Sequence, residues 1–394
     1  MNKSLNIMIL SPLSLENGRG GEISSMELAA GLNKYHKITL IDTNIIFNKN
    51  LLSKGSILKK LDGVERNDRI KFATLKIFNK HFTFPYFRDI FRLYKKIKNC
   101  NIIYTSNFTI KTNLLLVLFN LLHRNGRFLI GHRKPLYSEK LFSIYNLKNR
   151  ASFLLFSIFK KRFYHHTISY HAKKFLENFI SSNKITHIVH GIDLYDYADD
   201  SMVKKQDQKL NFIYVGYLDD IHKGVNVLLD GIEKIIEKDH KLDLFFEFCG
   251  EGPLENRLKK LQEKFPGYIR YNGYVNNEII SDYYKRNDVF LFTSRREPFG
   301  RVLIEALASN LLIICTKTFG SIEVLKNKKF AFFLNDLDAD LIKDKIIGIL
   351  ELWKEKIKDL RELQKLAKIY AFQNFDFKIE LEMFKELISK IMKD

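Results

Sequence analysis

Cysteine, proline and tryptophan are scarce in this chain of 394 residues, which holds three, six and one of them. The cysteines Cys100, Cys249 and Cys315 are scattered with no Cys-x-x-Cys pair, so neither a disulfide framework nor a zinc site is expected, and a reducing compartment is favoured. The longest apolar runs, 114–122 and 153–159, fall well short of the about 20 residues that a membrane-spanning helix needs. The sequence therefore predicts no transmembrane segment, and its short apolar start is typical of a strand rather than of a signal peptide.

Acidic residues are scarce in the first half only, and the net charge of +20 at pH 7 comes from there. Residues 1–195 hold 32 Lys and Arg against 11 Asp and Glu, a net charge of +21, whereas residues 196–394 hold 33 against 34. This asymmetry favours an acidic partner for the first half. A nucleic acid, an anionic membrane surface and a phosphorylated acceptor remain open at this point, as does a basic surface that faces only solvent.

Length and composition suit two packed domains, because 46% of the residues are hydrophobic and 28% are charged. Short apolar runs alternate with longer amphipathic stretches, which predicts parallel sheets with helices on both faces. The polar stretch 193–209 breaks this alternation and marks the expected domain junction. The expected strands are 5–10, 37–41, 101–105, 127–131 and 166–170 in the first half, and 210–215, 243–248, 268–271, 288–293 and 311–315 in the second.

The segment 288–309, DVFLFTSRREPFGRVLIEALAS, joins a buried strand to an amphipathic helix through a short loop. A helix that begins near Gly300 presents free backbone N–H groups and the positive end of its dipole, which suits a diphosphate. Glu297 precedes this helix and Glu305 lies just over one turn inside it, so both carboxylates can face one crevice. Carboxylates accept hydrogen bonds from the hydroxyls of sugars and riboses.

In this setting, Glu297-x7-Glu305 resembles the E-x7-E signature of retaining GT-B glycosyltransferases, specifically glycosyltransferase family 4 (glycosyl transferases group 1). Other segments resemble the family in the same order along the chain. Residues 212–229 resemble the strand, loop and helix whose Lys-Gly grips the donor diphosphate. Residues 248–253 resemble its Gly-x-Gly-Pro turn, and residues 271–275 resemble the strand end whose backbone frames the nucleotide base.

The first half carries weaker matches to the same family. Residues 18–31 resemble its Gly-Gly loop that leads into a helix, although a plain strand-to-helix turn would have the same sequence. His132 follows strand 127–131 where the family often has an active-site histidine, although a lone histidine often has no such function. Residues 190–193, HGID, resemble the Asn-Gly-Val-Asp element at the end of the first domain, and Ser169 also fits the pattern.

The resemblance runs from Gly20 to Glu305 and implies an α/β protein of the GT-B fold, with two Rossmann-like doubly wound parallel-sheet domains facing a central cleft. The domains implied are an acceptor-side domain at 1–192, a linker at 193–209, a nucleotide-sugar-binding domain at 210–372 and a terminal helix at 373–394 that crosses back to the first domain.

The resemblance also implies the roles of individual residues. The catalytic residues would be Glu297, His132 and Lys223, the last as a phosphate contact. The donor-binding residues would be Gly20, Gly21, Gly216, Tyr217, Lys223, Gly250, Gly273, Tyr274, Val275, Glu297, Phe299, Gly300, Arg301, Val302 and Glu305.

One residue departs from the family pattern. Tyr217 stands where the family often has an Arg that supports the diphosphate, so the charge clamp on the donor is expected to be weaker. Arg295, Arg296 and Arg301 are the candidates to replace that charge.

The activity implied is transfer of a sugar, with retained configuration, from a nucleotide-sugar donor to a glycan or lipid-linked acceptor. No metal or other cofactor is expected, because the lysine and the helix N–H groups would neutralise the leaving diphosphate. The Lys-, Asn-, Ile- and Phe-rich composition hints at an AT-rich bacterial genome, and so at synthesis of surface polysaccharide or lipopolysaccharide. The expected location is cytoplasmic, with the basic first half at the inner face of the plasma membrane.

Two other functions compete with this hypothesis. A non-catalytic nucleotide-sugar sensor would explain Tyr217. A nucleic-acid-binding protein would explain the basic first half, but no nucleic-acid module is recognised and the second-half motifs would have no role. We therefore expect no nucleic-acid partner.

Three further patterns in the sequence allow both a structural and a functional interpretation. Asp336, Asp338 and Asp340 form an Asp-x-Asp pattern, but helix capping explains it better than a metal, because an amphipathic segment follows. His165, His166 and His171 cluster without further ligands at metal-binding spacing. Segment 148–163 has an apolar middle between basic ends, which fits either a core helix or a helix lying on an anionic membrane.

Overall fold

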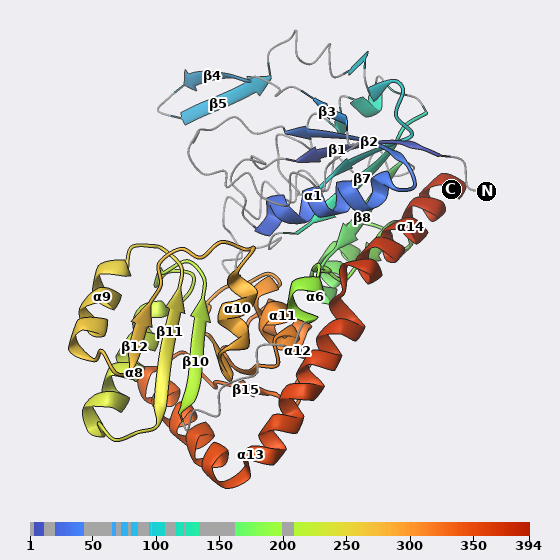
Figure 1. Ribbon diagram of the computed structural model, residues 1–394. Helices are drawn as coiled ribbons and strands as arrows, with labels where there is room; N and C mark the ends of the chain where they lie inside the picture. Colours follow the sequence, from blue (N-terminus) through green and yellow to red (C-terminus); the bar gives the residue numbers. More distant parts are fainter. Residues whose placement is uncertain are drawn as a thin grey trace. The chain divides into compact units, whose positions relative to one another are not determined.

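The computed structural model describes residues 4–11, 20–42, 65–67, 72–77, 80–85, 94–95, 97–106, 116–117, 119–121, 123, 125–133, 162–198 and 209–394. The chain divides into two compact units, Met1–Val189 with Glu380–Asp394, and His190–Ile379 (Figure 1). The division falls slightly before the predicted boundary at residue 192, and the end of the chain joins the first unit from Glu380 rather than from residue 373. Of the predicted linker, residues 193–198 belong to the second unit, and residues 199–208 lie outside the described part.

The first unit is built on a parallel seven-stranded sheet in the order β3-β2-β1-β6-β7-β8-β9. The order runs outward from β1 in both directions, as in doubly wound folds. A separate antiparallel pair is formed by β4 and β5. The strands are β1 (Asn6–Ser11), β2 (Lys37–Asp42), β3 (Glu65–Asn67), β4 (Phe72–Ile77), β5 (Lys80–Pro85), β6 (Ile102–Thr105), β7 (Arg127–His132), β8 (Phe163–Thr167) and β9 (Ile185–His187).

Apolar strands and helices make the core of the first unit. Its helices include α1 (Gly20–Asn33) and α6 (Tyr170–Glu177), with a 3-10 turn η2 (Ser182–Lys184). The side chains buried together include Met8, Leu10, Ile103, Phe119, Phe128, Ile130, Phe163 and Leu176. The strands β1, β6, β7 and β8 are buried at nearly every position, and β1 and β6 are accordingly mostly apolar runs rather than alternating patterns.

The predicted strand 166–170 was wrong in position. The strand β8 ends at Thr167, and the Oγ of Ser169 accepts a hydrogen bond of 3.2 Å from the backbone N–H of Ala172. Serine is a strong N-cap residue, so the chain leaves the sheet here and begins α6. The start of β8 was missed because His165 and His166 look polar in the sequence, yet both are buried.

The second unit is built on a parallel six-stranded sheet in the order β12-β11-β10-β13-β14-β15. The five strands predicted for the second half are present with their ends within one residue of the prediction, and the short β15 was not predicted. The strands are β10 (Leu210–Val215), β11 (Leu244–Cys249), β12 (Ile269–Tyr271), β13 (Val289–Phe292), β14 (Leu312–Cys315) and β15 (Ala331–Phe333).

Helices connect these strands and cover the sheet (Figure 1). They are α7 (Tyr195–Ala198), α8 (Val225–Lys238), α9 (Glu255–Lys264), α10 (Ile280–Lys285), α11 (Arg301–Ala308), α12 (Phe319–Leu325), α13 (Ala339–Phe375) and the start of α14 (Phe377–Lys393). The predicted capping by aspartate is confirmed, because the Asp338 carboxylate accepts from the backbone N–H groups of Asp340 and Leu341 at the start of α13.

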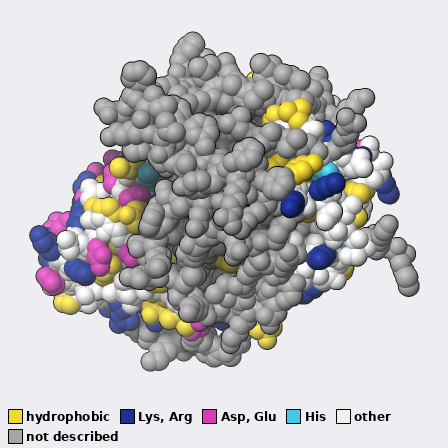
Figure 2. Space-filling view, turned by 90° about the horizontal axis from the view of Figure 1, so that it is seen from above, with side chains coloured by type: hydrophobic (Ala, Val, Ile, Leu, Met, Phe, Trp, Pro, Cys, Tyr) yellow, Lys and Arg dark blue, Asp and Glu magenta, His cyan; other side chains and the backbone are white. Residues whose placement is uncertain are grey.

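Acidic and basic side chains are intermixed on α8 and α9, at the left of Figure 2. Arg257 pairs with Asp230, and Lys264 pairs with Glu233 and Glu237. This pairing agrees with the balanced charge of the second half. Within the described residues, no helix is both long enough and apolar enough to cross a bilayer. Segment 148–161 lies outside these residues, so its two interpretations stay open.

Candidate functional site

Three glycine-containing loops follow β10, β11 and β12 at the carboxyl edge of the second sheet, and backbone hydrogen bonds join them. The Gly216 N–H donates to the Cys249 carbonyl at 3.0 Å, and the Gly250 N–H donates to the Gly273 carbonyl at 2.7 Å. A Cβ on Gly250 would lie 1.9 Å from the Gly216 oxygen, so only glycine fits there. Gly273 has a left-handed φ of 68°, which glycine tolerates best. These loops expose backbone at the edge where parallel sheets bind ligands.

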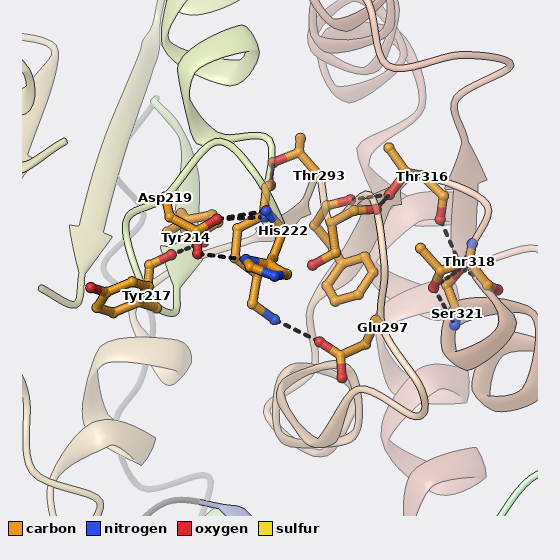
Figure 3. Close-up of polar contacts among 12 residues, drawn as sticks. Tyr214, Tyr217, Asp219, His222, Thr293, Glu297, Thr316, Thr318 and Ser321 are labelled. Atoms are coloured by element: carbon orange, nitrogen blue, oxygen red, sulfur yellow. Dashed lines mark hydrogen bonds and ion pairs between the residues drawn. The ribbon is translucent and has the colours of Figure 1, made fainter. Parts of the chain in front are cut away.

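Two tyrosines of these loops face solvent. Tyr217 follows Gly216 and is 52% exposed, and Tyr274 follows Gly273 and is 58% exposed. The Tyr217 backbone is nevertheless fixed, because the buried Tyr214 hydroxyl donates to its carbonyl at 3.0 Å (Figure 3). Burial, followed by the charges of Asp219 and Glu297, raises the pKa of Tyr214 above its usual range, so this hydroxyl keeps its proton.

The loop after β10 is shaped by Asp219. Its carboxylate accepts from the backbone N–H groups of His222 at 2.8 Å and Lys223 at 3.0 Å (Figure 3). Burial alone would raise the pKa of Asp219, but these two N–H groups together hold it below its usual range. Gly224 then turns the chain with a φ of 62°, and a Cβ there would clash with the Thr293 carbonyl at 2.6 Å. The loop after β10 therefore places Lys223 next to the loop after β13.

Lys223 and Glu297 form an ion pair with Nζ and Oε2 2.6 Å apart, and their side chains are 25% and 16% exposed (Figure 3). The two loops that carry them are bonded through the backbone as well. The Thr293 hydroxyl donates to the Lys223 carbonyl at 2.9 Å, and the Arg295 N–H donates to the His222 carbonyl at 2.8 Å. The structure thus brings together two of the three predicted catalytic residues.

The helix α11 begins directly after this pair, and its N-terminus has no side-chain cap. Gly300 precedes it with a left-handed φ of 90°, and no acidic residue lies in its first turn. By contrast, Asp220 bonds the first turn of α8, Asp338 caps α13, and Glu255 lies in the first turn of α9. Among these four helices, α11 is therefore the one whose N–H groups and positive dipole end suit an anion.

The loop between Ser294 and Gly300 is held from its other side by α12. The Gly320 N–H donates to the Glu297 carbonyl at 2.9 Å, and a Cβ on Gly320 would meet the Phe299 backbone at 2.5 Å. Hydroxyl groups extend this support, because Thr318 and Ser321 form a capping box and Thr316 donates to the Ser294 carbonyl at 2.6 Å (Figure 3). The backbone before α11 is therefore fixed on both sides.

The second glutamate of the motif has a different partner. Glu305 is half-buried on α11, and its Oε2 accepts a hydrogen bond of 3.1 Å from the hydroxyl of Tyr284. Val302, one of the predicted donor-binding residues, is half-buried, whereas Leu303 and Leu307 are fully buried. Val275 is also half-buried.

The HGID element stands at the start of the second unit. The His190 ring lies 5.4 Å from the buried Phe299 ring, and its Nε2 lies 3.3 Å from an Arg301 guanidinium nitrogen. Arg295 bonds the Asp220 backbone and carboxylate. Two of the arginines that were candidates to replace the missing charge at Tyr217 therefore have partners in this unit.

The predicted residues of the first unit lie in a different environment. Gly20 and Gly21 begin α1. His132 is 1% exposed at the end of β7, where its Nε2 lies 3.0 Å from Nδ1 of His165 and the two rings stack. Burial, followed by the charges of His165 and His166, holds the pKa of His132 well below its usual value. The roles of His132, Gly20 and Gly21 stay predictions.

Sequence reasoning missed the supporting residues Tyr214, Asp219, Tyr284 and Thr318. Asp219 had a recognisable signal in the sequence. An aspartate in the short loop before a helix is typical of a turn in which the carboxylate accepts from nearby backbone N–H groups. Tyr284 had none, because its partner lies 21 positions further along the chain. Among the described histidines, cysteines and carboxylates, no group of three or more is placed to hold a metal ion, and the expectation of a metal-free reaction stays a prediction.

Comparison with known proteins places this site in a family context. Residues 198–368 match the family model for glycosyl transferases group 1, so the second unit carries a domain of that kind. Mannosylfructose-phosphate synthase of Agrobacterium fabrum is 29% identical over 127 residues, which are 30% of this chain and 28% of that protein. An uncharacterized 41.2 kDa protein in the cps region of Klebsiella pneumoniae is 27% identical over 46% of this chain and 51% of its own length. The chain thus matches about half or less of these curated relatives.

Solved structures cover the whole chain. A glycosyltransferase from Rickettsia africae matches with a TM-score of 0.74 at 20% identity, covering 100% of both chains. Anabaena HepE in complex with UDP-glucose matches with a TM-score of 0.70 at 16% identity, covering 98% of this chain and 100% of that one. At such identities the likeness shows the fold, and it confirms the predicted two-domain α/β fold of the GT-B type.

Proposed function

We propose that this protein is a retaining glycosyltransferase of family 4 that transfers a sugar from a nucleotide-sugar donor bound by the second unit. The observation that carries the proposal is the Lys223–Glu297 ion pair beside the uncapped N-terminus of α11. A cation and free N–H groups suit a diphosphate, and a neighbouring carboxylate suits the hydroxyls of a sugar attached to it.

Each part of the donor has a matching group in this arrangement. The diphosphate lies at the N–H groups after Gly300 with Lys223 beside it. The sugar hydroxyls donate to Glu297, and the ribose hydroxyls donate to Glu305. The base lies along the backbone from Gly273 to Val275, where the glycine loops expose peptide groups.

The proposed reaction breaks the bond between the anomeric carbon and the donor phosphate oxygen. A bond from that carbon to the acceptor oxygen forms on the same face, and the acceptor proton passes to the departing phosphate. The Lys223 ammonium and the N–H groups of α11 stabilise the negative charge that develops on the leaving nucleoside diphosphate, so the chemistry needs no metal.

The acceptor in this proposal is a glycan or lipid-linked sugar bound by the basic first unit, at the inner face of a membrane. Three findings support it: the net charge of +21 over residues 1–195, the Klebsiella relative from a cps region, and the 28% identity over 159 residues to a yeast phosphatidylinositol N-acetylglucosaminyltransferase subunit. Synthesis of a surface polysaccharide or lipopolysaccharide accommodates all three.

The test is a binding and turnover screen of the purified protein with UDP-, GDP-, ADP- and CMP-sugars. UDP-sugars come first, because HepE was solved with UDP-glucose and the pneumococcal O-GlcNAc transferase with UDP and GlcNAc. One nucleotide series should raise the melting temperature and release its free nucleotide (UDP, GDP, ADP or CMP) once an acceptor is supplied. Inversion of the anomeric configuration in the product would reject the retaining mechanism, and no binding in any series would reject the donor site.

A second candidate function is a nucleotide-sugar sensor without turnover. The exposed Tyr217, at the position where the family often has an arginine, favours it. The same screen separates the two functions, because a sensor binds the donor and neither hydrolyses nor transfers its sugar over prolonged incubation with acceptor extracts.

A further inference from the structure

Tyr284 is completely buried in α10, and its hydroxyl donates a hydrogen bond of 3.1 Å to Oε2 of Glu305 on the adjacent α11 (Figure 1). Aromatic rings hold it in place, with Phe290 at 5.8 Å and Tyr197 at 6.3 Å between ring centroids. A tyrosine packed in this way has little rotational freedom, so the direction of its hydroxyl is fixed by the core.

This hydroxyl donates at every physiological pH. Burial, followed by the nearby charge of Glu305, raises the pKa of Tyr284 well above its usual value. Glu305 therefore accepts a hydrogen bond from a neutral hydroxyl whose position is fixed. A carboxylate has about four lone-pair sites, and this bond takes one of them without preventing the group from accepting ligand hydroxyls.

We propose that Tyr284 is a positioning residue that holds Glu305 in the orientation that recognises the ribose of the donor, and so sets the preference for ribose over deoxyribose. The inference rests on the proposed function, in which Glu305 binds the ribose. A site built to accept a hydroxyl rejects the analogue that lacks it, because its polar group is then left without that partner. Without the Tyr284 hydroxyl, the Glu305 side chain samples more rotamers before the donor binds. Ordering that side chain on binding then costs additional free energy, which weakens the affinity for the ribose.

The chain offers a matched control in the preceding residue. Tyr283 lies on the same helix, is half-buried, and has the Arg286 guanidinium 4.0 Å from its ring centroid. Removing its hydroxyl makes the same chemical change as Tyr284→Phe in the same element, while the hydrogen bond to Glu305 remains.

The experiment compares wild type, Tyr284→Phe and Tyr283→Phe with UDP-glucose and with its 2′-deoxy and 3′-deoxyuridine counterparts, or with the corresponding series if the screen identifies another base. In wild type, kcat/KM should be higher for the ribose donor. In Tyr284→Phe that preference should fall on the order of tenfold through KM, the size expected for a hydrogen bond to a charged group, with kcat nearly unchanged. Tyr283→Phe should keep the wild-type preference.

A purely structural role predicts a different result, in which Tyr284→Phe lowers kcat/KM equally for ribose and deoxyribose donors, and that outcome overturns the inference. If Tyr284→Phe does not fold by circular dichroism, 4-fluorophenylalanine incorporated at position 284 fills nearly the same volume as the tyrosine but cannot donate to Glu305, and it should show the same loss of preference. Absence of turnover by wild type with every nucleotide sugar rejects the proposed function instead. Turnover by wild type without any ribose preference rejects this inference alone.

Discussion

The two units share a parallel sheet but differ in the side chains at the carboxyl ends of their strands. In the first unit, His132 and His165 lie at or near the ends of β7 and β8, fully buried and stacked on each other. In the second, glycine loops expose backbone, and a partly exposed ion pair joins Lys223 to Glu297. Among the described residues, the first edge buries the histidine rings beside the paired Arg133 and Glu380, while the second carries the Lys223–Glu297 pair beside the uncapped start of α11. The comparison teaches that the same architecture can bury its ionisable groups completely at one edge and leave a pair partly exposed at the other, depending on which residues end its strands.

The largest loss of turnover should come from removing the charge of Lys223 at the carboxyl edge of the second sheet. Lys223→Gln leaves the leaving diphosphate without its cation, so turnover should fall about 10²–10³-fold. Lys234→Gln is the matched control, because Lys234 also pairs with a carboxylate, Asp340, at 2.7 Å but on the exposed surface towards the far end of α8. Steady-state kinetics of both variants measure the difference. Similar losses in the two would mean that the charge of the unit as a whole, rather than this pair, matters.

The next effect should come from the glycine that lets the loops pack. In Gly250→Ala the new methyl group overlaps the Gly216 oxygen, so we expect the free energy of unfolding of the second unit to fall by about 3 kcal/mol. Denaturant unfolding followed by Trp353 fluorescence reports on this unit, since Trp353 is the single tryptophan of the chain and lies in α13. Gly267→Ala is the control, with nothing within 4 Å of its new Cβ, and should change stability by at most about 0.5 kcal/mol. A tolerated Gly250→Ala would show that the loops can move apart.

The stability of the first unit should depend on pH through the buried histidines at the end of its sheet. Burial lowers the pKa of His165 to about 3 and, with the neighbouring histidines, holds that of His132 well below 6.5. In the unfolded chain both titrate near 6.5, so the unfolded state binds more protons below that pH. The contribution of both rings to stability is therefore complete above about pH 6.5 and is lost as the pH falls, by about 2 kcal/mol for His165 at pH 5.

Hydrogen exchange between pH 7.5 and pH 5, corrected for intrinsic rates, measures this difference between the units. The amides of β7 and β8 should lose protection before those of β10 and β13. His165→Phe should flatten the pH dependence, whereas His171→Gln should not, because His171 is exposed on α6. Earlier opening of the second unit would contradict the contrast drawn between the two edges.

The sequence predicted the loops of the second sheet better than the strand ends of the first. The reason is the distance along the sequence between the residues that contact each other. The strand, the loop with Lys223 and the helix after Gly300 are each encoded within about 20 residues, so periodicity and glycine position suffice. The extent of β8 was misjudged because His165 and His166 are buried through contacts with segments far away in the sequence, including β6, β7 and α14. The three-residue strands β9 and β15 have too few residues for a period to be visible. The Tyr284–Glu305 bond depends on how α10 packs on α11, which no local pattern contains.

The smallest effect should come from Asp219, which shapes the second edge without being expected to touch the donor. Asp219→Asn keeps an acceptor oxygen for the N–H groups of His222 and Lys223, whereas Asp219→Ala leaves both without it and should cost about 1 kcal/mol. The pKa of Asp219 lies below its usual 3.8, so its contribution is complete above that pH and is lost as the pH falls further; measurements at pH 7 record all of it.

Because this loop carries Lys223, Asp219→Ala should raise KM for the donor severalfold and change kcat less. Asp239→Ala removes a comparable bond, to the Lys241 N–H at 2.8 Å, from the exposed turn after α8, and it should leave KM unchanged. Equal KM values in the two alanine variants would mean that the Thr293 hydroxyl, through its bond to the Lys223 carbonyl, holds the lysine without help from Asp219. The charge of the second edge would then be fixed by the loop after β13 rather than by the loop that carries it.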